Sequence, residues 1–261
     1  MAEGNENGVI IEVRDLVTHY GDTKVLDGIT FDVRRGEVFM IVGASGCGKT
    51  TLLKHLCGLL RPTSGRILFQ DRDIAAMDED ELAVMQRSIG IAFQSSGLFN
   101  SMTVGENVAM PMVEYSAVTP DLVDSLVRMK LSLVGLSAAQ NMMPSDLSGG
   151  MRKRAGLARA MAVDPDLVYF DEPSAGLDPI MAAGLDELVI KMNRLLGMTF
   201  VIVTHELDSI RLAAHRVLML DRGRIIFLGT VEEAERSGVE RVRQFFERRP
   251  DDHITQTMLA G

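Results

Sequence analysis

Short apolar runs alternate along the chain with longer segments of helical periodicity. The runs Val38–Val42, Leu167–Phe170 and Phe200–Val203 are apolar without alternation, which is typical of strands buried on both faces. The segments Val9–Val13 and Ile29–Val33 alternate apolar and polar residues better, which favours an antiparallel flank. This pattern predicts an α/β fold, in which helices cover a mixed sheet.

The same pattern predicts four more strands and seven helices. The strands are Ile67–Phe69, Ile89–Phe93, Val217–Leu220 and Arg224–Leu228, and the helices follow Gly48, Asp78, Met102, Pro120, Ser148, Pro179 and Glu206. Because residues 95–161 lack strand-like runs, we expect them to form a helical insert. The predicted core is then residues 1–94 and 162–229, followed by a helical tail of mixed charge at residues 230–261.

Composition narrows the possible functions. The 36 acidic side chains outnumber the 27 basic ones and give a net charge of −9, which argues against nucleic acid as a partner. The chain has no run of about 20 apolar residues, so no membrane span is expected. Its start has no basic region and no apolar signal core, and its two cysteines form no disulfide framework. A soluble cytosolic chain is therefore expected.

A phosphate-binding motif follows the strand at Val38–Val42. The residues that match GxxxxGK[ST] are Gly43, Ala44, Ser45, Gly46, Cys47, Gly48, Lys49 and Thr50. Glycines let successive backbone N–H groups face a phosphate, and the start of the next helix adds positive potential. Lys49 can reach the β- and γ-phosphates, and the Thr50 hydroxyl can hold Mg²⁺. The motif predicts a nucleotide triphosphate site.

Two adjacent carboxylates end the strand at Leu167–Phe170. Asp171 and Glu172 should lie at the carboxyl edge of the sheet, where α/β proteins bind ligands. Asp171 suits Mg²⁺ through water, and Glu172 suits orienting and deprotonating an attacking water. An acidic loop after a strand is common, so the upstream phosphate motif is what favours this function.

A second glycine-rich helix start lies at Ser148, Gly149 and Gly150. Alone it could be an ordinary helix cap. A second phosphate cradle makes sense if it closes over the nucleotide of another subunit. The basic run Arg152–Arg154 that follows is predicted to be a solvated helix face.

The order of these motifs resembles the ATPase subunits of ABC transporters, over about Val9 to Gly229. The resemblance implies a P-loop ATPase core, with residues 95–161 as the helical subdomain that carries the signature LSGG. It implies that ATP and Mg²⁺ bind and that two copies of this chain dimerise around two ATP. For nucleotide binding, the resemblance implies that Tyr20 stacks on adenine, that Gly43 to Thr51 bind the phosphates, and that Thr50, Gln94 and Asp171 contact the metal. For catalysis, it implies that Glu172 is the general base, that His205 contacts the γ-phosphate, and that Lys49 and Gln94 contribute. Across the dimer, it implies a phosphate contact by Ser148, Gly149 and Gly150 and signalling by Asp178.

Weaker features point to a subfamily. The segments GENVAMPMVEYSAVTP and MMPSDLSGGM resemble the ATPases of Mla-type, MCE-linked phospholipid transporters, in which Met151 also replaces the usual glutamine. This resemblance implies two copies of a membrane permease, an MCE-domain substrate-binding protein and a small STAS-domain regulator. It places the chain on the cytoplasmic face of the inner membrane. The tail residues Gln244–Phe246 could contact the other ATPase subunit or simply pack on their own domain.

Other classes share some of these motifs. DNA-maintenance ATPases interrupt the core with long coiled coils, whereas only a short stretch separates Gln94 from Leu147 here. Translation factors carry two cassettes, and this chain has one phosphate-binding motif. Binding-only cassettes typically lack the base, which is present as Glu172. An ABC ATPase of another importer or exporter, with a non-lipid substrate, stays open as an alternative.

Overall fold

Two sheets organise the chain. The computed structural model describes residues 8–115 and 119–250. The larger sheet has the strand order β10-β9-β3-β8-β7-β6, and the smaller has the order β2-β1-β4-β5. The strands are β1 Val9–Tyr20, β2 Thr23–Arg34, β3 Val38–Gly43, β4 Ser64–Phe69, β5 Arg72–Asp73, β6 Ile89–Ala92, β7 Leu167–Asp171, β8 Thr199–Val203, β9 Arg216–Asp221 and β10 Arg224–Gly229.

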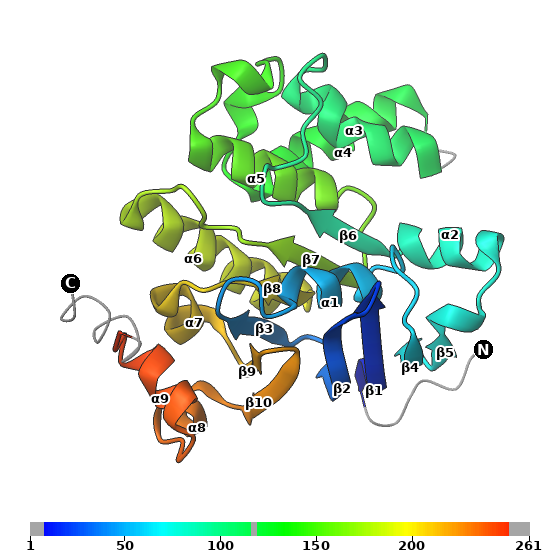
Figure 1. The fold of residues 1–261 in the computed structure, drawn as a ribbon. Coiled ribbons are helices and arrows are strands. Elements are labelled where there is room, and N and C mark those ends of the chain that lie inside the picture. The colour runs from blue at the N-terminus through cyan, green and yellow to red at the C-terminus, as the bar shows by residue number, and fades with distance from the viewer. Residues whose placement is uncertain (1–7, 116–118, 251–261) are drawn as a thin grey trace.

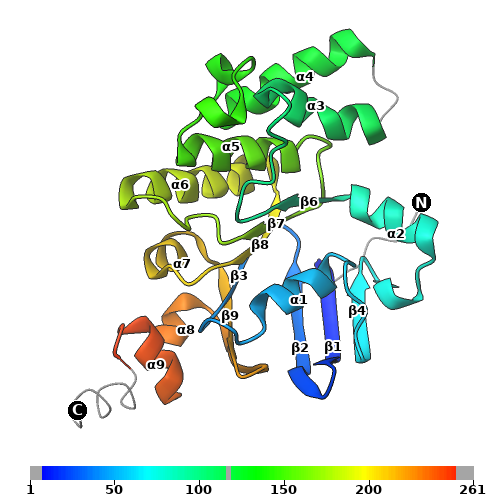
Figure 2. The same ribbon diagram turned by 45° about the horizontal axis from the view of Figure 1, so that its top comes forward.

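Helices surround the larger sheet. They are α1 Lys49–Leu56, α2 Glu79–Arg87, α3 Val104–Tyr115, α4 Pro120–Leu133, α5 Gly149–Ala160, α6 Pro179–Leu196, α7 Leu207–Ala213, α8 Val231–Glu235 and α9 Glu240–Phe246. Figure 1 shows α3, α4 and α5 gathered above one end of the sheet, away from β1 and β2. Figure 2 shows α6 below α5 and the pair α8–α9 beside β9.

The predicted mixed sheet and antiparallel flank are confirmed. Strands β3, β6, β7, β8 and β9 pair in parallel, and β10 adds to β9 in the antiparallel sense. In the smaller sheet, β1 pairs antiparallel with both β2 and β4. All residues of β3 and β8 are buried, as their unbroken apolar runs predict.

Each face of the larger sheet supports its own hydrophobic core. Alternate residues of β3 show the division, because Met40 packs with the helices α3–α7 while Phe39 and Ile41 pack with the smaller sheet and α1. The sheet is thus fixed from both sides, and its carboxyl edge is a rigid platform for the loops that follow β3, β7 and β8.

The first strands are longer than the sequence pattern predicts. β1 continues past Val13 to Tyr20, and its pairing with β2 shifts register between Val13 and Leu16. Asp15 lies at this irregularity with φ of 47°. A bulge lets the strand continue, but it breaks the alternation of apolar and polar residues on which the prediction rests.

The described residues of 95–161 form helices and turns, and no strand occurs among them. The seven predicted helix starts agree with α1 to α7 to within a residue or two. None of the described helices is long and apolar enough to cross a membrane.

The described part of the tail packs on its own domain. Val242 and Phe246 of α9 are buried in the core on the helical side of the sheet. Arg211 of α7 donates to the Phe246 carbonyl oxygen at 3.0 Å and pairs with Glu235 at 2.8 Å. The last eleven residues of the predicted tail, 251–261, lie outside the described residues.

A buried carboxyl group joins α6 to α7. The Ser209 hydroxyl donates to Asp186 at 2.7 Å, and burial raises the pKa of Asp186 to about 6, with Glu206 and Asp208 adding to the effect. The folded state therefore binds this proton more tightly than the unfolded state, so the stability that Asp186 contributes is full below pH 4 and falls as the pH rises through 6.

We expect Asp186→Asn to be more stable than the parent chain by on the order of 2 kcal/mol at pH 8, because a neutral amide avoids that cost. Urea unfolding at pH 4.5 and pH 8 measures the difference. The gain should shrink at the lower pH, and an equal gain at both values would contradict the assignment.

Candidate active site

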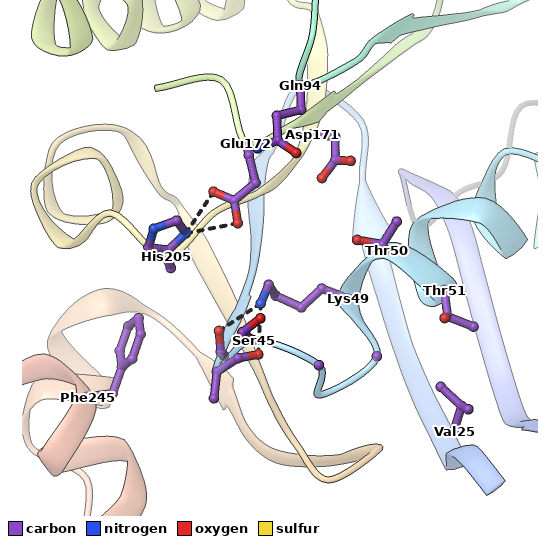
Figure 3. A pocket seen from close by; sticks show the side chains of 14 residues that line it. Val25, Ser45, Lys49, Thr50, Thr51, Gln94, Asp171, Glu172, His205 and Phe245 are labelled. Carbon is purple, nitrogen blue, oxygen red and sulfur yellow. Dashed lines mark hydrogen bonds and ion pairs between the residues drawn. The ribbon is translucent and has the colours of Figure 1, made fainter. Parts of the chain in front are cut away.

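A large cavity lies at the carboxyl edge of the larger sheet. It has a volume of about 750 Å³ and is lined by the loops after β3, β6, β7 and β8. Its lining residues are Val25, Gly43, Ala44, Ser45, Gly46, Gly48, Lys49, Thr50, Thr51, Gln94, Asp171, Glu172, His205 and Phe245. This is the edge at which α/β folds bind ligands (Figure 3).

The loop between β3 and α1 needs glycine at two positions. Gly43 has φ of 145°, and a Cβ there would lie 2.3 Å from the Leu220 carbonyl oxygen. Gly48 has φ of 109°, and a Cβ would lie 2.8 Å from Leu26 Cδ2. Glycine alone fits these sites, because it combines positive φ with the absence of a side chain. The backbone can therefore wrap closely around a ligand.

The start of α1 is suited to an anion. Gly48 caps the helix without a side-chain hydrogen bond, so the first amide N–H groups are left to face the cavity. The Lys49 ammonium is mostly buried and donates to the carbonyl oxygens of Gly43 at 2.8 Å and Ala44 at 3.0 Å. The Lys49 ammonium and several backbone N–H groups therefore lie at the same part of the cavity, where they can donate hydrogen bonds to phosphate oxygens.

The acidic pair lies opposite this loop. Asp171 is the last residue of β7, and burial raises its pKa, with the nearby Glu172 charge adding to the effect. Lys153 and Lys49 act in the opposite direction. Asp171 is therefore held where a bound cation would relieve the cost of its burial.

Glu172 and His205 form a pair beside the phosphate loop. His205 Nδ1 makes a hydrogen bond with Glu172 Oε1 at 3.0 Å and lies 2.9 Å from Oε2, though only the first contact has hydrogen-bond geometry. Among the described atoms, Glu172 Oε2 is buried without a hydrogen-bond partner. Because buried oxygens normally accept a hydrogen bond, this atom is free to accept one from a water molecule in the cavity.

The predicted metal ligands fit Mg²⁺ by their chemistry. Thr50, Gln94 and Asp171 offer a hydroxyl, an amide and a carboxylate oxygen, and all three line the cavity. Oxygen ligands are the ones that Mg²⁺ prefers, usually one or two carboxylates completed by waters and substrate phosphates. These three residues come from three separate elements, so only the fold brings them together (Figure 3).

The structure places some predicted site residues away from this cavity. Cys47 does not line it, because its side chain is buried under the loop, where burial raises the pKa of the thiol. Tyr20 ends β1 with about half its surface exposed, and Val25 of the neighbouring strand lines the cavity instead. Adenine stacking by Tyr20 stays a prediction.

The residues predicted to act across a dimer have structural roles within this chain. Ser148 accepts a hydrogen bond from the Met151 amide at 3.2 Å and so caps α5. A Cβ at Gly150 would lie 2.2 Å from Met181 Cε, so the Met181 side chain on α6 packs directly against the start of α5. Asp178 caps α6 by accepting from the Ile180 and Met181 amides at 3.0 Å. Gly149 lies beside Ser148 at the start of α5.

The charge pattern of the sequence does not predict the inward position of Lys153, nor that Phe245 lines the cavity. The prediction of a solvated basic run is wrong for Lys153, which is only 6% exposed. Phe245, on α9, reaches the cavity of its own chain near His205 (Figure 3). The helical phase of α5 could have flagged Lys153, because its neighbours at positions 150 and 157 are a glycine and a leucine.

Comparison with known proteins decides the family. A family model described as ABC transporter matches residues 26–175. The chain belongs to the ABC transporter family. This cassette is an ATPase.

Individual relatives extend the match over nearly the whole cassette. The intermembrane phospholipid transport system ATP-binding protein MlaF of Haemophilus influenzae is 39% identical over 96% of this chain and 94% of its own. The probable ribonucleotide transport ATP-binding protein mkl of Mycobacterium leprae is 39% identical over 93% of this chain and 70% of its own.

A solved structure shows the same fold as a dimer. The dimeric bacterial ABC transporter cassette MJ0796 is 28% identical with a TM-score of 0.78, covering 85% of this chain and 98% of that one. A second structure of MJ0796 shows a post-hydrolysis state bound to ADP and Pi.

Proposed function

We propose that this cassette is the ATP-hydrolysing subunit of a phospholipid transporter and works as a homodimer around two ATP and Mg²⁺. The observation that carries the ATPase site is the cavity in which the phosphate loop, Gln94, the acidic pair and His205 converge. The observation that favours phospholipid is the match to MlaF, which covers almost all of both chains.

The geometry supports hydrolysis by general base catalysis. Lys49 and the amides at the start of α1 would hold the phosphates. Thr50, Gln94 and Asp171 would hold Mg²⁺, which would supply positive charge near the phosphate oxygens. Glu172 accepts a proton from the water that attacks the γ-phosphorus, while the bond from that phosphorus to the ADP oxygen breaks. His205 holds the Glu172 carboxylate in place at 3.0 Å and faces the γ-phosphate.

In a dimer, the second copy would bring its Ser148–Gly150 segment to this ATP site. Ser148, Gly149 and Gly150 do not line the cavity of their own chain, and Asp178 also lies outside it. Facing a second copy, the start of α5 would close over the ATP held by the other subunit. The dimeric form of MJ0796 supports this arrangement.

The remaining partners follow from the subfamily. We infer a membrane permease, an MCE-domain substrate-binding protein and a STAS-domain regulator, with this chain on the cytoplasmic face of the inner membrane. The net charge of −9 disfavours nucleic acid as a partner. The described helices between Gln94 and Leu147, α3 and α4, span 12 and 14 residues, which is too short for the long coiled coil of a DNA-maintenance ATPase.

The match to mkl supports a second candidate, a ribonucleotide transporter. To separate the two, we would purify the complete membrane assembly through an N-terminal tag on this chain, identify its subunits by mass spectrometry and measure its ATP turnover in proteoliposomes. A phospholipid system should bring down an MCE-domain protein, and its turnover should respond to phospholipid composition. A periplasmic solute-binding protein in its place, or turnover that responds instead to an added ribonucleotide other than ATP, would overturn the phospholipid assignment.

A further inference from the structure

One face of α5 holds the loop that carries Gln94. Lys153, Gly156 and Arg159 recur every three residues along this face, so they lie in one row. The Lys153 ammonium donates to the Gln94 carbonyl oxygen, and Arg159 donates to that of Gly97. Between them, a Cβ at Gly156 would lie 2.8 Å from the Ser96 carbonyl oxygen, so the loop rests directly on the helix.

Lys153 also reaches the catalytic strand. Its ammonium donates to the Glu172 carbonyl oxygen at 3.1 Å, and so bridges the backbones of Gln94 and Glu172. Glu172 has φ of 46°, a left-handed conformation that is unfavourable for a residue with a side chain. Such a conformation persists only where its surroundings fix it.

Three contacts fix the Glu172 backbone. Its amide donates to Val203 at 2.8 Å, and its carbonyl oxygen accepts from Ala175 at 3.2 Å and from Lys153. Of these three hydrogen bonds, the one from Lys153 is made by a side chain. Lys153 lies on α5, the helix that begins at the signature residues Ser148, Gly149 and Gly150. Its ammonium donates to two backbone carbonyl oxygens, those of Gln94 and Glu172.

The charge of Lys153 is costly where it lies. Burial lowers its pKa, and the nearby charges of Asp171 and Glu172 act in the opposite direction. An apolar side chain of the same length would fill this space without that cost. The presence of a charged group at this buried position is therefore explained by its hydrogen bonds to two carbonyl oxygens and by the nearby carboxylates of Asp171 and Glu172.

We propose that Lys153 is a positioning residue for ATP hydrolysis, which holds the backbones of Gln94 and Glu172 so that both side chains face the γ-phosphate. The inference rests on the proposed roles of those two residues. It also means that a movement of α5, whose first residues face the other subunit, is passed directly to the metal ligand and the base.

The test compares Lys153→Met and Lys153→Arg in the full-length chain. For Lys153→Met we expect kcat to fall about tenfold or more, which is within the range of a misplaced general base, while the KM for ATP and the melting temperature change little. Lys153→Arg keeps a cation that can donate to both carbonyls, so its kcat should recover to within about threefold of the parent. Lys191→Met, at an exposed position on α6, is the control for loss of charge.

Other outcomes overturn the proposal. A Lys153→Met chain with unchanged kcat would do so, and so would equal kcat in the Met and Arg variants. If Lys153→Met does not fold, Lys153→Gln replaces it, and the proposal then requires a higher kcat in the Arg variant than in the Gln variant. Normal turnover in Glu172→Gln would instead defeat the assigned base, whatever the Lys153 variants show.

Discussion

Replacing Glu172 by glutamine is expected to lower ATP turnover by about 10² to 10⁴, which is the range for loss of a general base. An amide cannot take the proton of the attacking water, but it keeps the size of the side chain and can still meet His205. The phosphate loop is untouched, so ATP should still bind, and the dimer that closes around it should accumulate. Phosphate release measures the turnover, and size-exclusion chromatography with ATP measures the dimer.

Glu206→Gln is the matched control, because Glu206 lies on the other side of the same histidine, 3.5 Å from His205 Nε2. Its turnover should stay within about threefold of the parent, since it does not line the cavity. Equal losses in the two variants would show that the general charge around His205, rather than a base at Glu172, sets the rate.

Replacing Lys49 by methionine should lower ATP turnover about as much as Glu172→Gln does, but through the loss of a phosphate contact rather than of the base. The ammonium is the cation of the phosphate loop, and its removal should cost about 10² to 10³ in turnover, as for loss of one donor to a developing charge. Nucleotide affinity should fall as well, so this variant should not accumulate the ATP-bound dimer. Binding of a fluorescent ATP analogue, measured beside turnover, separates it from Glu172→Gln.

Lys54→Met controls for the change in net charge, because Lys54 lies on the same helix with its side chain exposed. We expect its nucleotide affinity to stay within about threefold of the parent. If Lys49→Met bound ATP as tightly as Lys54→Met does, the phosphate contact assigned to Lys49 would be wrong.

The sequence predicts the phosphate loop well because one contiguous motif specifies it. Gly43 and Gly48 both have positive φ and a close neighbour where a Cβ would lie, and Lys49 opens the helix as expected. Asp171 and Glu172 could be placed because a buried strand ends at them. In each case the local pattern also fixes the position in space.

The basic run on α5 shows where such reasoning stops. Three consecutive helical residues point in directions about 100° apart, so they cannot share one environment. Arg152 donates to the Leu147 carbonyl oxygen, Lys153 points inward to Gln94, and Arg154 donates to Val134. Charge alone predicts a solvated face, whereas the helical phase of α5 would turn Lys153 inward. The carbonyl oxygens of Gln94 and Val134, which accept from Lys153 and Arg154, lie in segments distant in the sequence, so no local pattern reveals these acceptors.

The sequence cannot predict which side chains reach the cavity through the packing of distant helices and strands. That Phe245 lines the cavity depends on where α9 packs, and α9 is held by Arg211 of α7. The order of the motifs predicts a nucleotide contact for Tyr20, whereas Val25 of β2 lines the cavity. Side chains brought to a site by tertiary packing leave no signal in the spacing of residues near it.

The position of α9 has a practical consequence for anyone preparing this protein. Phe245 is a wall of the ATP cavity, and the adjoining hollow of about 150 Å³ runs from Ala44 to Arg249. Trimming the chain before α9 would open the nucleotide site to solvent on that side. Nucleotide affinities are therefore best measured on the full chain with any affinity handle at the N-terminal end, because the start of β1 lies well away from α9 (Figure 1).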